Sequence, residues 1–302
     1  MWYFCLLQLM HIESLKIFCN LVETESFTKA AHINGVTQSA ISQQIAVMER
    51  LFKSPLVERS KKRFRLTNEG QLLFNYAKQI IQTYEAMHSH LQQVKDTIAG
   101  NIRVATVYSI GLHDLPPYVK KFMRSYPTVN VQVEYRRASQ VYEDVLGNVV
   151  DLGLVVYPAK NPLLDIIPHH KETLVLICHP HHPFAKLKNA KLKMLTGQKF
   201  VGFEPEIPTR KALDKIFHKH NVSVKFVAEF DNIETVKGAV EIDEGISVVP
   251  QSTITQEVAK LTLAAVTLED GAFYRPTAVI YKKNKVLSPA MKQFLALLKE
   301  GD

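Results

Sequence analysis

The 302-residue chain has few cysteines, and their spacing excludes two classes of site. Cys5, Cys19 and Cys178 are its three cysteines, and none forms a CxxC pair. This spacing matches neither a disulfide framework nor a cysteine zinc site, and it fits a reducing cytoplasm. We expect buried, unreactive thiols; a redox-sensing pair is the alternative.

The chain also lacks any apolar run of the length that spans a bilayer. The apolar segment 1–9 has no basic leader and no small-residue cleavage site after it, so it does not fit a signal peptide. We expect it to be an N-terminal extension, either disordered or upstream of a natural start at Met10. No membrane association is predicted, and the expected location is the cytoplasm.

Sequence motifs of common enzyme classes are missing as well. The chain contains no GxSxG, Walker, GxGxxG or HExxH motif. We therefore predict that the protein is not an enzyme and has no catalytic residues and no cofactor. A catalytic site assembled from distant residues stays open as the alternative.

Five histidines lie close together in the sequence, at positions 169, 170, 179, 181 and 182. Imidazole suits zinc, copper and nickel. Prolines interrupt the second group, which is typical of an exposed turn. We therefore predict no metal site.

Positive charge is concentrated near the N-terminus. Residues 10–67 carry nine Lys and Arg against five Glu, a surplus of four that is half of the chain's net charge of +8. Five of these cations fall within residues 59–65. A local cation excess of this kind favours nucleic acid as a partner.

Three short amphipathic helices are expected before this basic run. The first has an apolar face that includes Leu15 and Phe18, and the second begins at Ser26 and contains Ala30 and Ala31. Asn34-Gly35 marks a turn. The third begins at Thr37 and has a core face formed by Ile41, Ile45, Met48 and Phe52.

The opposite face of the third helix is polar and uncharged. Gln38, Ser39, Ser42 and Gln43 project from its first turn and a half. Gln pairs with adenine edges and Ser with base edges or phosphates, as a recognition helix requires. A solvated surface face suits the same residues. The basic run at 59–65 has the alternation of a hairpin wing whose cations would contact the phosphate backbone, which favours the recognition helix.

Residues 68–99 are expected to form a long linker helix. Leu73, Ala77, Ile80, Tyr84, Met87, Leu91, Val94 and Ile98 follow one another in alternating steps of four and three residues. A seam this narrow is typical of a helix that pairs with a second copy. Thr67 is the expected N-cap and Gly100 the expected stop. Packing of the helix on its own domain is the alternative.

From Ile102 onward, the sequence consists of short apolar runs that alternate with amphipathic stretches. The expected strands are 102–107, 129–135, 152–156, 174–178, 200–203, 224–228, 246–249 and 277–281. The expected helices are 112–125, 139–147, 209–220, 232–242 and 288–300. This order predicts an α/β fold with largely parallel sheets.

The N-terminal segment resembles the signature of LysR-type transcriptional regulators over about 55 residues. The matching positions are 15–18, 23, 26–31, 36–42, 44, 45, 49, 55, 56, 58, 59, 66, 67 and 70. In this family position 43 is often basic, position 46 frequently basic, position 34 usually apolar and position 39 commonly proline; this chain has Gln43, Ala46, Asn34 and Ser39.

The resemblance implies an α+β multidomain protein that binds promoter DNA under the control of a small molecule. It has a winged helix-turn-helix at 10–67, a dimerisation helix at 68–99 and a C-terminal module of two α/β subdomains similar to periplasmic binding proteins. We place the first subdomain at 101–168 plus 268–302 and the second at 169–267, with crossovers near 174–178 and 261–266. Homodimers, tetramers and recruitment of RNA polymerase are also implied. The predicted DNA-binding residues are Thr28, Thr37, Gln38, Ser39, Ser42, Gln43, Arg59, Lys61, Lys62, Arg63 and Arg65.

The effector itself is unidentified, but its position follows from the expected fold. Open α/β sheets bind ligands beyond the carboxyl ends of their strands, often at helix N-termini. Thr209, Ser139 and Asp231 fit N-caps equally well, and Arg210 fits a salt bridge with Asp214. The predicted effector-binding residues are Ser109, Gly111, Ser139, Phe203, Glu204, Thr209, Arg210, Asn232 and Ile246.

Two further functions fit parts of the sequence. A solute-binding protein would need only residues 101–302, and the basic N-terminal module and the absence of a signal peptide argue against it. An architectural DNA-binding protein would not need the C-terminal module.

Overall fold

The structure is a computed structural model that describes residues 11–58, 64–94 and 98–299. The expected extension at 1–9 lies outside these residues. The chain divides into two compact units, the first formed mainly by residues before Gly100 and the second mainly by residues from Gly100 onward.

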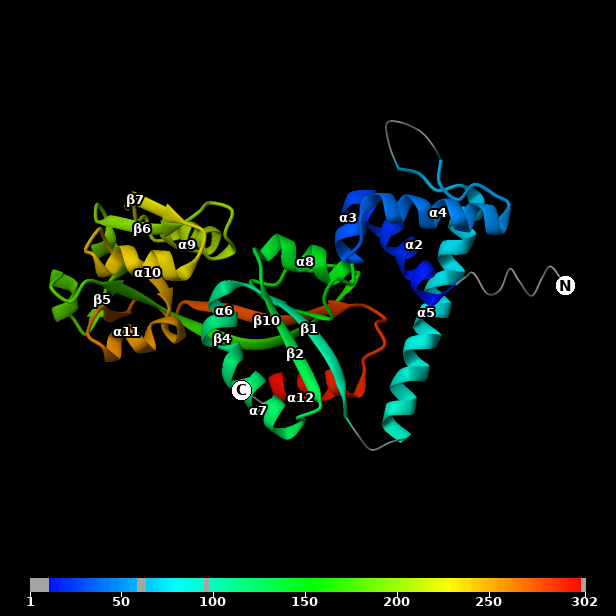
Figure 1. The fold of residues 1–302 in the computed structure, drawn as a ribbon. Coiled ribbons are helices and arrows are strands. Elements are labelled where there is room, and N and C mark those ends of the chain that lie inside the picture. Colours follow the sequence, from blue (N-terminus) through cyan, green and yellow to red (C-terminus); the bar gives the residue numbers. More distant parts are fainter. Residues whose placement is uncertain (1–10, 59–63, 95–97, 300–302) are drawn as a thin grey trace. The chain divides into compact units, whose positions relative to one another are not determined.

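The N-terminal unit begins with three helices, α2 (Ile12–Thr24), α3 (Phe27–Ile33) and α4 (Gln38–Phe52) (Figure 1). Side-chain caps start two of them. The Ser26 side chain accepts a hydrogen bond from the Lys29 amide and the Thr37 side chain accepts one from the Ala40 amide. These caps satisfy amides that a helix start leaves unpaired, and they fix the turn between α3 and α4.

The core between these helices follows the predicted faces with one exception. Phe18, Ala30, Ile41, Ile45 and Met48 are at most 4% exposed. Phe52, which we expected in this core, is 41% exposed, so that prediction is wrong. It is the last residue of α4, directly before Lys53, where the chain leaves the helix in the left-handed conformation.

Asn34 occupies a position where an apolar residue was expected from the family pattern. Its side-chain amide donates to the Ala30 carbonyl at 2.7 Å, and its side-chain oxygen accepts from Asn20 at 3.0 Å. A local hydrogen-bond network therefore takes the place of apolar packing under the turn.

A short hairpin and a long helix complete the N-terminal unit. Val57 and Leu66 form an antiparallel bridge, and the Glu58 amide donates to the Arg65 carbonyl at 2.9 Å, so the strands of the predicted wing pair at its base. Helix α5 (Asn68–Val94) follows, and Thr67 caps it by accepting from the Gly70 amide at 2.9 Å.

The predicted seam of α5 divides between two environments. Ala77 is fully buried and Leu73 partly buried in the core of the same unit, which is the alternative that we considered for the whole helix. Further along, Ile80, Tyr84 and Met87 are 46%, 37% and 46% exposed. Leu72 and Tyr76 extend this exposed apolar face toward the helix start. Among the seam residues whose side chains the structure describes, Ile80, Tyr84 and Met87 are therefore available to a partner.

The C-terminal unit consists of two subdomains joined by shared strands (Figure 1). The sheet of the first subdomain has the order β2-β1-β3-β10-β4, and its helices are α6, α7, α8 and α12. The bounds are β1 Gly100–Thr106, α6 Tyr108–His113, α7 Leu115–Ser125, β2 Val129–Tyr135, α8 Ala138–Leu146, β3 Leu152–Val156, β4 Leu164–Cys178, β10 Tyr274–Lys282 and α12 Pro289–Lys299. Helices α7 and α12 lie on one face of this sheet and α8 on the other.

The second subdomain is built on the far half of β4, which pairs with β8 and β9. A separate two-stranded sheet, β6-β7, packs beside it. The bounds are β5 Asn189–Ala190, β6 Lys199–Phe203, α9 Pro208–Lys219, β7 Lys225–Phe230, α10 Ile233–Glu241, β8 Ser247–Pro250, α11 Thr255–Ala259 and β9 Ala264–Leu268, with 3-10 turns at Pro183–Lys186, Leu192–Leu195 and Gln251–Ile254.

The prediction of largely parallel sheets is only partly right. Strand β1 pairs parallel with β2 and β3, and β6 pairs parallel with β7. Strand β10 is antiparallel to both neighbours, and β4 is antiparallel to β8 and β9. The antiparallel pairs arise because the chain crosses between subdomains twice in opposite directions. Strand β4 leaves its pairing with β10 at Thr173 and begins to pair with β8 at Leu174.

Gly70 provides a test of the packing between α5 and the wing base. A Cβ at this position would lie 2.1 Å from the Leu56 carbonyl oxygen. We expect Gly70→Ala to lower the free energy of unfolding of the N-terminal unit by about 1–3 kcal/mol, because the backbone must move to admit the methyl group. Thermal denaturation of the full chain measures this.

Gly238→Ala is the matched control. Gly238 is also helical, in α10, and an added Cβ there meets nothing within 4 Å. Alanine has the higher helix propensity, so we expect no loss of stability. Equal melting curves for Gly70→Ala and the parent chain would show that the close approach is not a constraint.

Candidate functional sites

Helix α4 presents the polar face that the sequence predicted. Gln38, Ser39, Ser42 and Gln43 are all exposed, while Ile41, on the opposite side of the helix, is fully buried. Thr37 and Ser39 share a hydrogen bond between their hydroxyl oxygens at 2.9 Å. The face is therefore held by a packed back and carries donors and acceptors without charge.

The remaining predicted DNA-binding residues fall on two other segments. Thr28 is exposed on α3, and Arg65 is exposed at the base of the hairpin. Arg59, Lys61, Lys62 and Arg63 lie outside the described residues.

A second candidate site is a cleft between the two subdomains of the C-terminal unit. It lies beyond the carboxyl ends of β1 and β3 and beside the N-terminus of α10. The residues that line it are Val107, Tyr108, Ser109, Arg136, Arg137, Ala138, Val156, Phe203, Ile207, Pro208, Asp231, Asn232, Ile233 and Arg275.

The floor of the cleft contains a buried ion pair. Arg275 on β10 and Glu172 on β4 are direct cross-strand partners, and the Arg275 Nε donates to Glu172 Oε2 at 2.8 Å. Both side chains are less than 10% exposed. Arg275 Nη1 also donates to Ser109 Oγ at 2.8 Å, and Ser252 Oγ donates to Glu172 Oε1 at 2.7 Å. This network fixes the start of α6 and the 3-10 turn after β8 to the crossing strands.

Tyr157 follows β3 close to this ion pair, in a conformation that is uncommon for a bulky side chain. Its φ of +47° lies in the left-handed region. Its hydroxyl is buried and has no hydrogen-bond partner among the described residues. Burial raises the pKa of Tyr157 to about 12. Strain and an unpaired buried hydroxyl together are features of ligand sites.

Contacts across the cleft join the two subdomains. Arg137, just before α8, lies 3.2 Å from Asp231 and 3.4 Å from Glu204, both in the second subdomain. His113 at the end of α6 lies 2.8 Å from Glu234 on α10. The cavity volume of the cleft is about 50 Å³, well below the 300–1,000 Å³ of typical ligand sites. The cleft is therefore in a closed arrangement.

Three of the predicted effector-binding residues, Ser109, Phe203 and Asn232, line the cleft. Glu204 contacts it indirectly through Arg137. Asn232 is the N-cap of α10 and accepts from the Thr235 amide at 3.1 Å. Asp231, which we had considered as a helix N-cap, instead forms an ion pair with Arg137.

The other five predicted effector residues are not among those that line the cleft. Ile246 is fully buried in the core of the second subdomain, and Thr209 is 2% exposed as the second residue of α9 rather than its N-cap. Ser139 is exposed on α8. The strand-to-helix rule locates segments at a cleft but does not tell which way each side chain points.

Arg210 is held entirely by its own subdomain. Its Nε donates to Asp214 at 2.8 Å, which is the salt bridge considered as an alternative in the sequence analysis. Its Nη1 donates to the Phe203 carbonyl and to Glu229. The guanidinium also lies 3.7 Å from the centroid of the Phe226 ring. Through these contacts Arg210 links α9 to β6 and β7.

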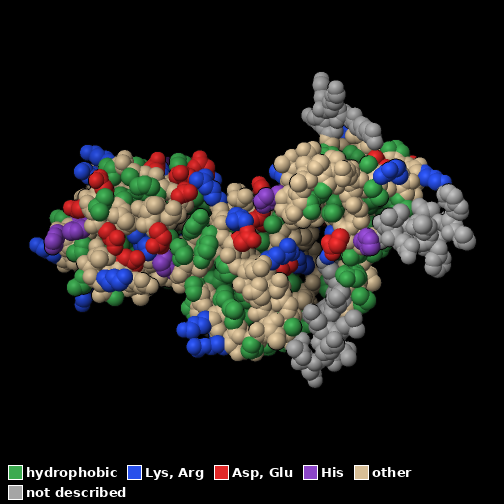
Figure 2. Space-filling model, in the orientation of Figure 1, with side chains coloured by type: hydrophobic (Ala, Val, Ile, Leu, Met, Phe, Trp, Pro, Cys, Tyr) green, Lys and Arg blue, Asp and Glu red, His purple; other side chains and the backbone are tan. Residues whose placement is uncertain are grey.

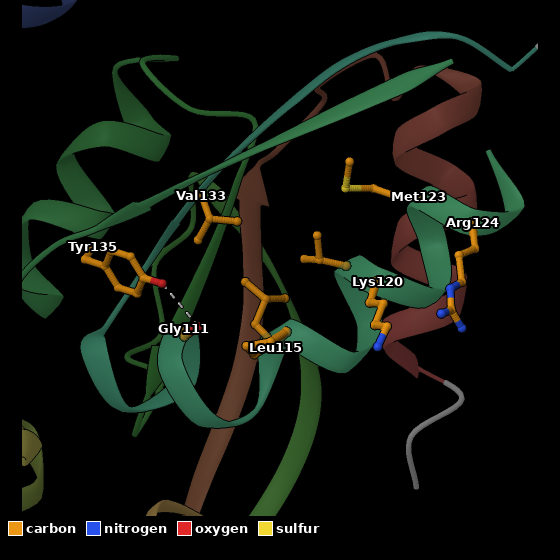
Figure 3. Close-up of a pocket in the computed structure, with 9 residues that line it drawn as sticks. Gly111, Leu115, Lys120, Met123, Arg124, Val133 and Tyr135 are labelled. Carbon is orange, nitrogen blue, oxygen red and sulfur yellow. Dashed lines mark hydrogen bonds between the residues drawn. The ribbon is translucent and has the colours of Figure 1, made fainter. Parts of the chain in front are cut away.

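Gly111 lines a different and larger hollow, a groove of about 550 Å³ between α7 and the edge strand β2. Figure 3 shows Val133 and Tyr135 on β2 opposite Gly111 and Leu115, with Lys120 and Arg124 at the rim. A Cβ on Gly111 would lie 2.6 Å from the Tyr135 ring, so glycine is needed there for packing. The groove is mostly apolar, whereas polar groups converge on the cleft, so the cleft is the better candidate for a small polar ligand.

The described cysteines are buried in both units. Cys178 on β4 is fully buried, and burial raises the pKa of its thiol to about 11. Cys19 is buried in the N-terminal core. A thiol with a raised pKa carries little thiolate, so Cys178 has the properties of a packing residue.

Comparison with known proteins identifies both units. Residues 12–71 match the family model of the bacterial regulatory helix-turn-helix of the lysR family, and residues 95–302 match that of the LysR substrate binding domain. The chain belongs to the LysR family of bacterial transcriptional regulators.

Individual relatives agree with this assignment. A probable RuBisCO transcriptional regulator of Cyanidioschyzon merolae is 29% identical over 94% of this LysR-type chain and 95% of its own length. The regulatory domain of CcmR from Synechocystis PCC6803, solved in complex with 2-PG, has a TM-score of 0.61 and 27% identity over 67% of this chain and 96% of that one. Full-length OxyR from Pseudomonas aeruginosa has a TM-score of 0.71 over 97% of this chain and 94% of that one, at 17% identity, and shows the shared fold.

The predicted family, fold class and regulator function are thereby confirmed. This LysR-type protein has a helix-turn-helix domain for DNA and a domain for a small-molecule effector. Within the described residues, no helix has the length and apolar character needed to cross a membrane. Figure 2 shows Lys and Arg side chains intermixed with Asp and Glu over the second subdomain.

The ion pair on the cleft floor makes a testable prediction about stability. We expect Glu172→Ala to lower the free energy of unfolding by about 3–5 kcal/mol, because it leaves the Arg275 guanidinium buried without its counter-ion. Glu134→Ala removes a carboxylate from a partly exposed arginine, Arg136, and should cost less than about 1 kcal/mol. Thermal or urea denaturation compares the two variants, and similar losses would contradict the structural role of Glu172.

Proposed function

We propose that the chain reads promoter DNA through the exposed polar face of α4, with the wing residues on the phosphate backbone. The observation that supports this most directly is that Gln38, Ser39, Ser42 and Gln43 are exposed together on a helix whose opposite side is packed into the domain core. Thr28, Thr37, Arg59, Lys61, Lys62, Arg63 and Arg65 would contact the flanking backbone.

This proposal separates two kinds of variant. We expect Gln38→Ala to weaken binding to the promoter upstream of the protein's own gene by about 1–3 kcal/mol and to leave binding to unrelated DNA unchanged, because a base contact carries specificity. Arg65→Ala should weaken binding to both DNAs and reduce the slope of log affinity against log salt by about one, because a phosphate contact releases a counter-ion. Fluorescence anisotropy across a salt series measures both effects.

Gln256→Ala, an exposed glutamine in α11 of the C-terminal unit, is the control for the loss of a glutamine. A chain that lacks residues 1–67 should lose salt-dependent promoter binding. If it binds as well as the full chain at every salt concentration, or if Gln38→Ala matches Gln256→Ala on both DNAs, the proposed DNA interface is wrong.

We further propose that the chain acts as a homodimer, with pairs of dimers forming tetramers, in the cytoplasm where promoter DNA is present. The exposed apolar face of α5, formed by Leu72, Tyr76, Ile80, Tyr84 and Met87, is the surface that supports pairing of two copies. A dimer presents two recognition helices to two half-sites. Contact with RNA polymerase on such a promoter belongs to the same proposal.

The proposed effector is a small organic anion, a carboxylate or a phosphate ester, bound in the cleft between the subdomains. Arg136, Arg137 and Arg275 converge on the cleft, and the N-terminus of α10 ends at it. Ser109 and the unpaired Tyr157 hydroxyl add hydrogen-bonding groups near its floor. Cations and a helix N-terminus favour an anion. The similar CcmR domain in complex with 2-PG makes 2-PG the first compound to test.

Ser109 and Ser139 form a matched pair for testing the cleft. Both serines were predicted from the sequence to contact the effector, and only Ser109 lines the cleft. We expect Ser109→Ala to raise the Kd for the effector about tenfold or more, as loss of a hydrogen bond to a charged group does. Ser139→Ala should leave the Kd unchanged.

Calorimetric titration with 2-PG, inorganic phosphate and a panel of small carboxylates and phosphate esters identifies the compound to use, and promoter binding is then measured with and without it. Absence of binding by every anion in the panel, or a loss of affinity in Ser139→Ala alone, would contradict the proposed ligand class and site.

A further inference from the structure

The five neighbouring histidines of the sequence separate into two groups in the structure. His179 and His181 lie on the turn after β4, with ring centroids 5.1 Å apart and His181 exposed, and His182 caps the 3-10 turn at Pro183–Lys186. His169 and His170 lie in the first subdomain beside Asp114, which is 55 residues away from His169 in sequence. The fold thus brings a carboxylate that is distant in sequence next to this pair.

A β-bulge places the two consecutive histidines on the same side of the sheet. Successive strand residues normally point to opposite faces. The pairing of β4 with β10 shifts register between Pro276 and Ala278, so His169 and His170 together lie opposite Thr277. Thr277 Oγ1 accepts a hydrogen bond from the His170 amide at 2.9 Å and lies 3.2 Å from the His170 carbonyl oxygen. These side-chain contacts take the place of the regular backbone hydrogen bonds between the two strands. Bulges re-aim side chains in this way, and Pro276 lacks an amide donor for the ladder.

The distances between the three side chains fit a single metal ion. His169 Nε2 lies 2.9 Å from Asp114 Oδ2, and His170 Nε2 lies 3.5 Å from Asp114 Oδ1. One ligand atom from each residue lies within 4.8 Å of the others. Metal–ligand bonds of about 2.0–2.1 Å in a tetrahedral site place ligand atoms about 3.3 Å apart. The two histidine–carboxylate distances, measured to different oxygens of Asp114, lie on either side of this value.

The surroundings of the cluster orient its ligands. His169 is fully buried, and its Nδ1 donates to the Leu298 carbonyl at 2.8 Å, which aims Nε2 at Asp114. Metal-binding histidines typically have such a carbonyl partner on the second nitrogen. Asp114 lies at the start of α7, yet its carboxylate makes no side-chain cap hydrogen bond among the described residues and accepts from the imidazoles instead.

Both nitrogens of His169 therefore face oxygen acceptors, so Nε2 occupies a position where a positive charge is stabilised. A divalent cation at Nε2 would take the place of the proton that Nε2 shares with the Asp114 carboxylate. His170 and Asp114 are 19% and 14% exposed, which leaves a path for an ion from the surface.

We propose that Asp114, His169 and His170 form a binding site for one divalent first-row transition metal ion, with Zn²⁺ as the fitting example. Two imidazole nitrogens and a carboxylate oxygen are a ligand set that Zn²⁺ accepts, and a fourth position remains for water. Coordination by His170 replaces its 2.9 Å hydrogen bond with the Tyr118 hydroxyl. The ion would join the α6–α7 junction to the crossing strand β4, and so act on the element that carries Ser109.

The test uses the full-length protein after treatment with a chelator and dialysis. Calorimetric titration with Zn²⁺ should give one ion per chain at this site, and Co²⁺ should give a visible absorption spectrum of a nitrogen- and oxygen-ligated ion. His170→Gln and Asp114→Asn should each weaken binding at least about tenfold, since even changes outside the ligand shell have effects of that order. Circular dichroism in chelator shows whether each variant is folded.

The exposed turn provides the control, because histidines on a surface also bind Zn²⁺. The double variant His179→Gln with His181→Gln removes that group and should keep one tight site and its Co²⁺ spectrum. Failure of the parent chain to bind Zn²⁺ stoichiometrically overturns the proposal. Tight binding that survives in folded His170→Gln, or disappears in the turn double variant, overturns it as well.

Discussion

The two strands that cross between the subdomains, β4 and β10, are tied together by the buried pair of Glu172 and Arg275. Burial of two charges costs several kcal/mol per ion, and hydrogen bonds from neighbouring groups offset part of that cost. Here Ser109 and Ser252 supply one such hydrogen bond each, one from each subdomain, and Arg275 Nη2 has Glu172 as its ion-pair partner. The ion pair therefore determines where α6 begins and where the chain turns after β8, and it places the floor of the cleft at the crossing point.

Much of the fold could be predicted from the sequence because its signals are local. The expected strands at 129–135 and 152–156 have the observed bounds, and the expected helices from 139 onward lie within two residues of the observed ones. Strand direction has no local signal, since a buried apolar run looks the same in either orientation. The first half of β4 was missed because Pro168, His169, His170 and Lys171 interrupt the apolar pattern, and these are the residues that face the bulge.

The two candidate sites differ in how much of each could be predicted, for the same physical reason. The polar face of α4 lies within six residues of one helix, so helical periodicity alone brings its members together. The cleft is assembled from seven separated stretches of sequence, and its floor joins Glu172 to Arg275 across 103 residues of sequence. Nothing in the sequence around Arg275 distinguishes it from an exposed strand cation. Gly111 and Ile246 were predicted to bind the effector because they lie in the expected segments. In the structure they are packing residues instead.

The closed cleft and the rigid floor together suggest how a small ligand can change the arrangement of the subdomains. Arg137 is 55% exposed in its pairs with Asp231 and Glu204, and exposed ion pairs contribute only about 0–1 kcal/mol each. The contact between His113 and Glu234 is also at the surface. Burial raises the pKa of Glu234, but hydrogen bonds from His113 and Lys237 outweigh it and hold the pKa below its ordinary value, so this contact persists to lower pH than a lone carboxylate would allow.

Opening the rim therefore breaks weak contacts, while the Glu172–Arg275 pair at the hinge stays intact. A ligand shifts the balance only by its difference in affinity for the two arrangements. Suppose that an anion makes two or three charge-assisted hydrogen bonds in one arrangement and not in the other. Each such bond is worth about 1.5–3 kcal/mol, so together they are sufficient to outweigh the rim contacts. In the effector site that we propose, this division between a weak rim and a strong floor would let the cleft respond to a small molecule without loss of the fold.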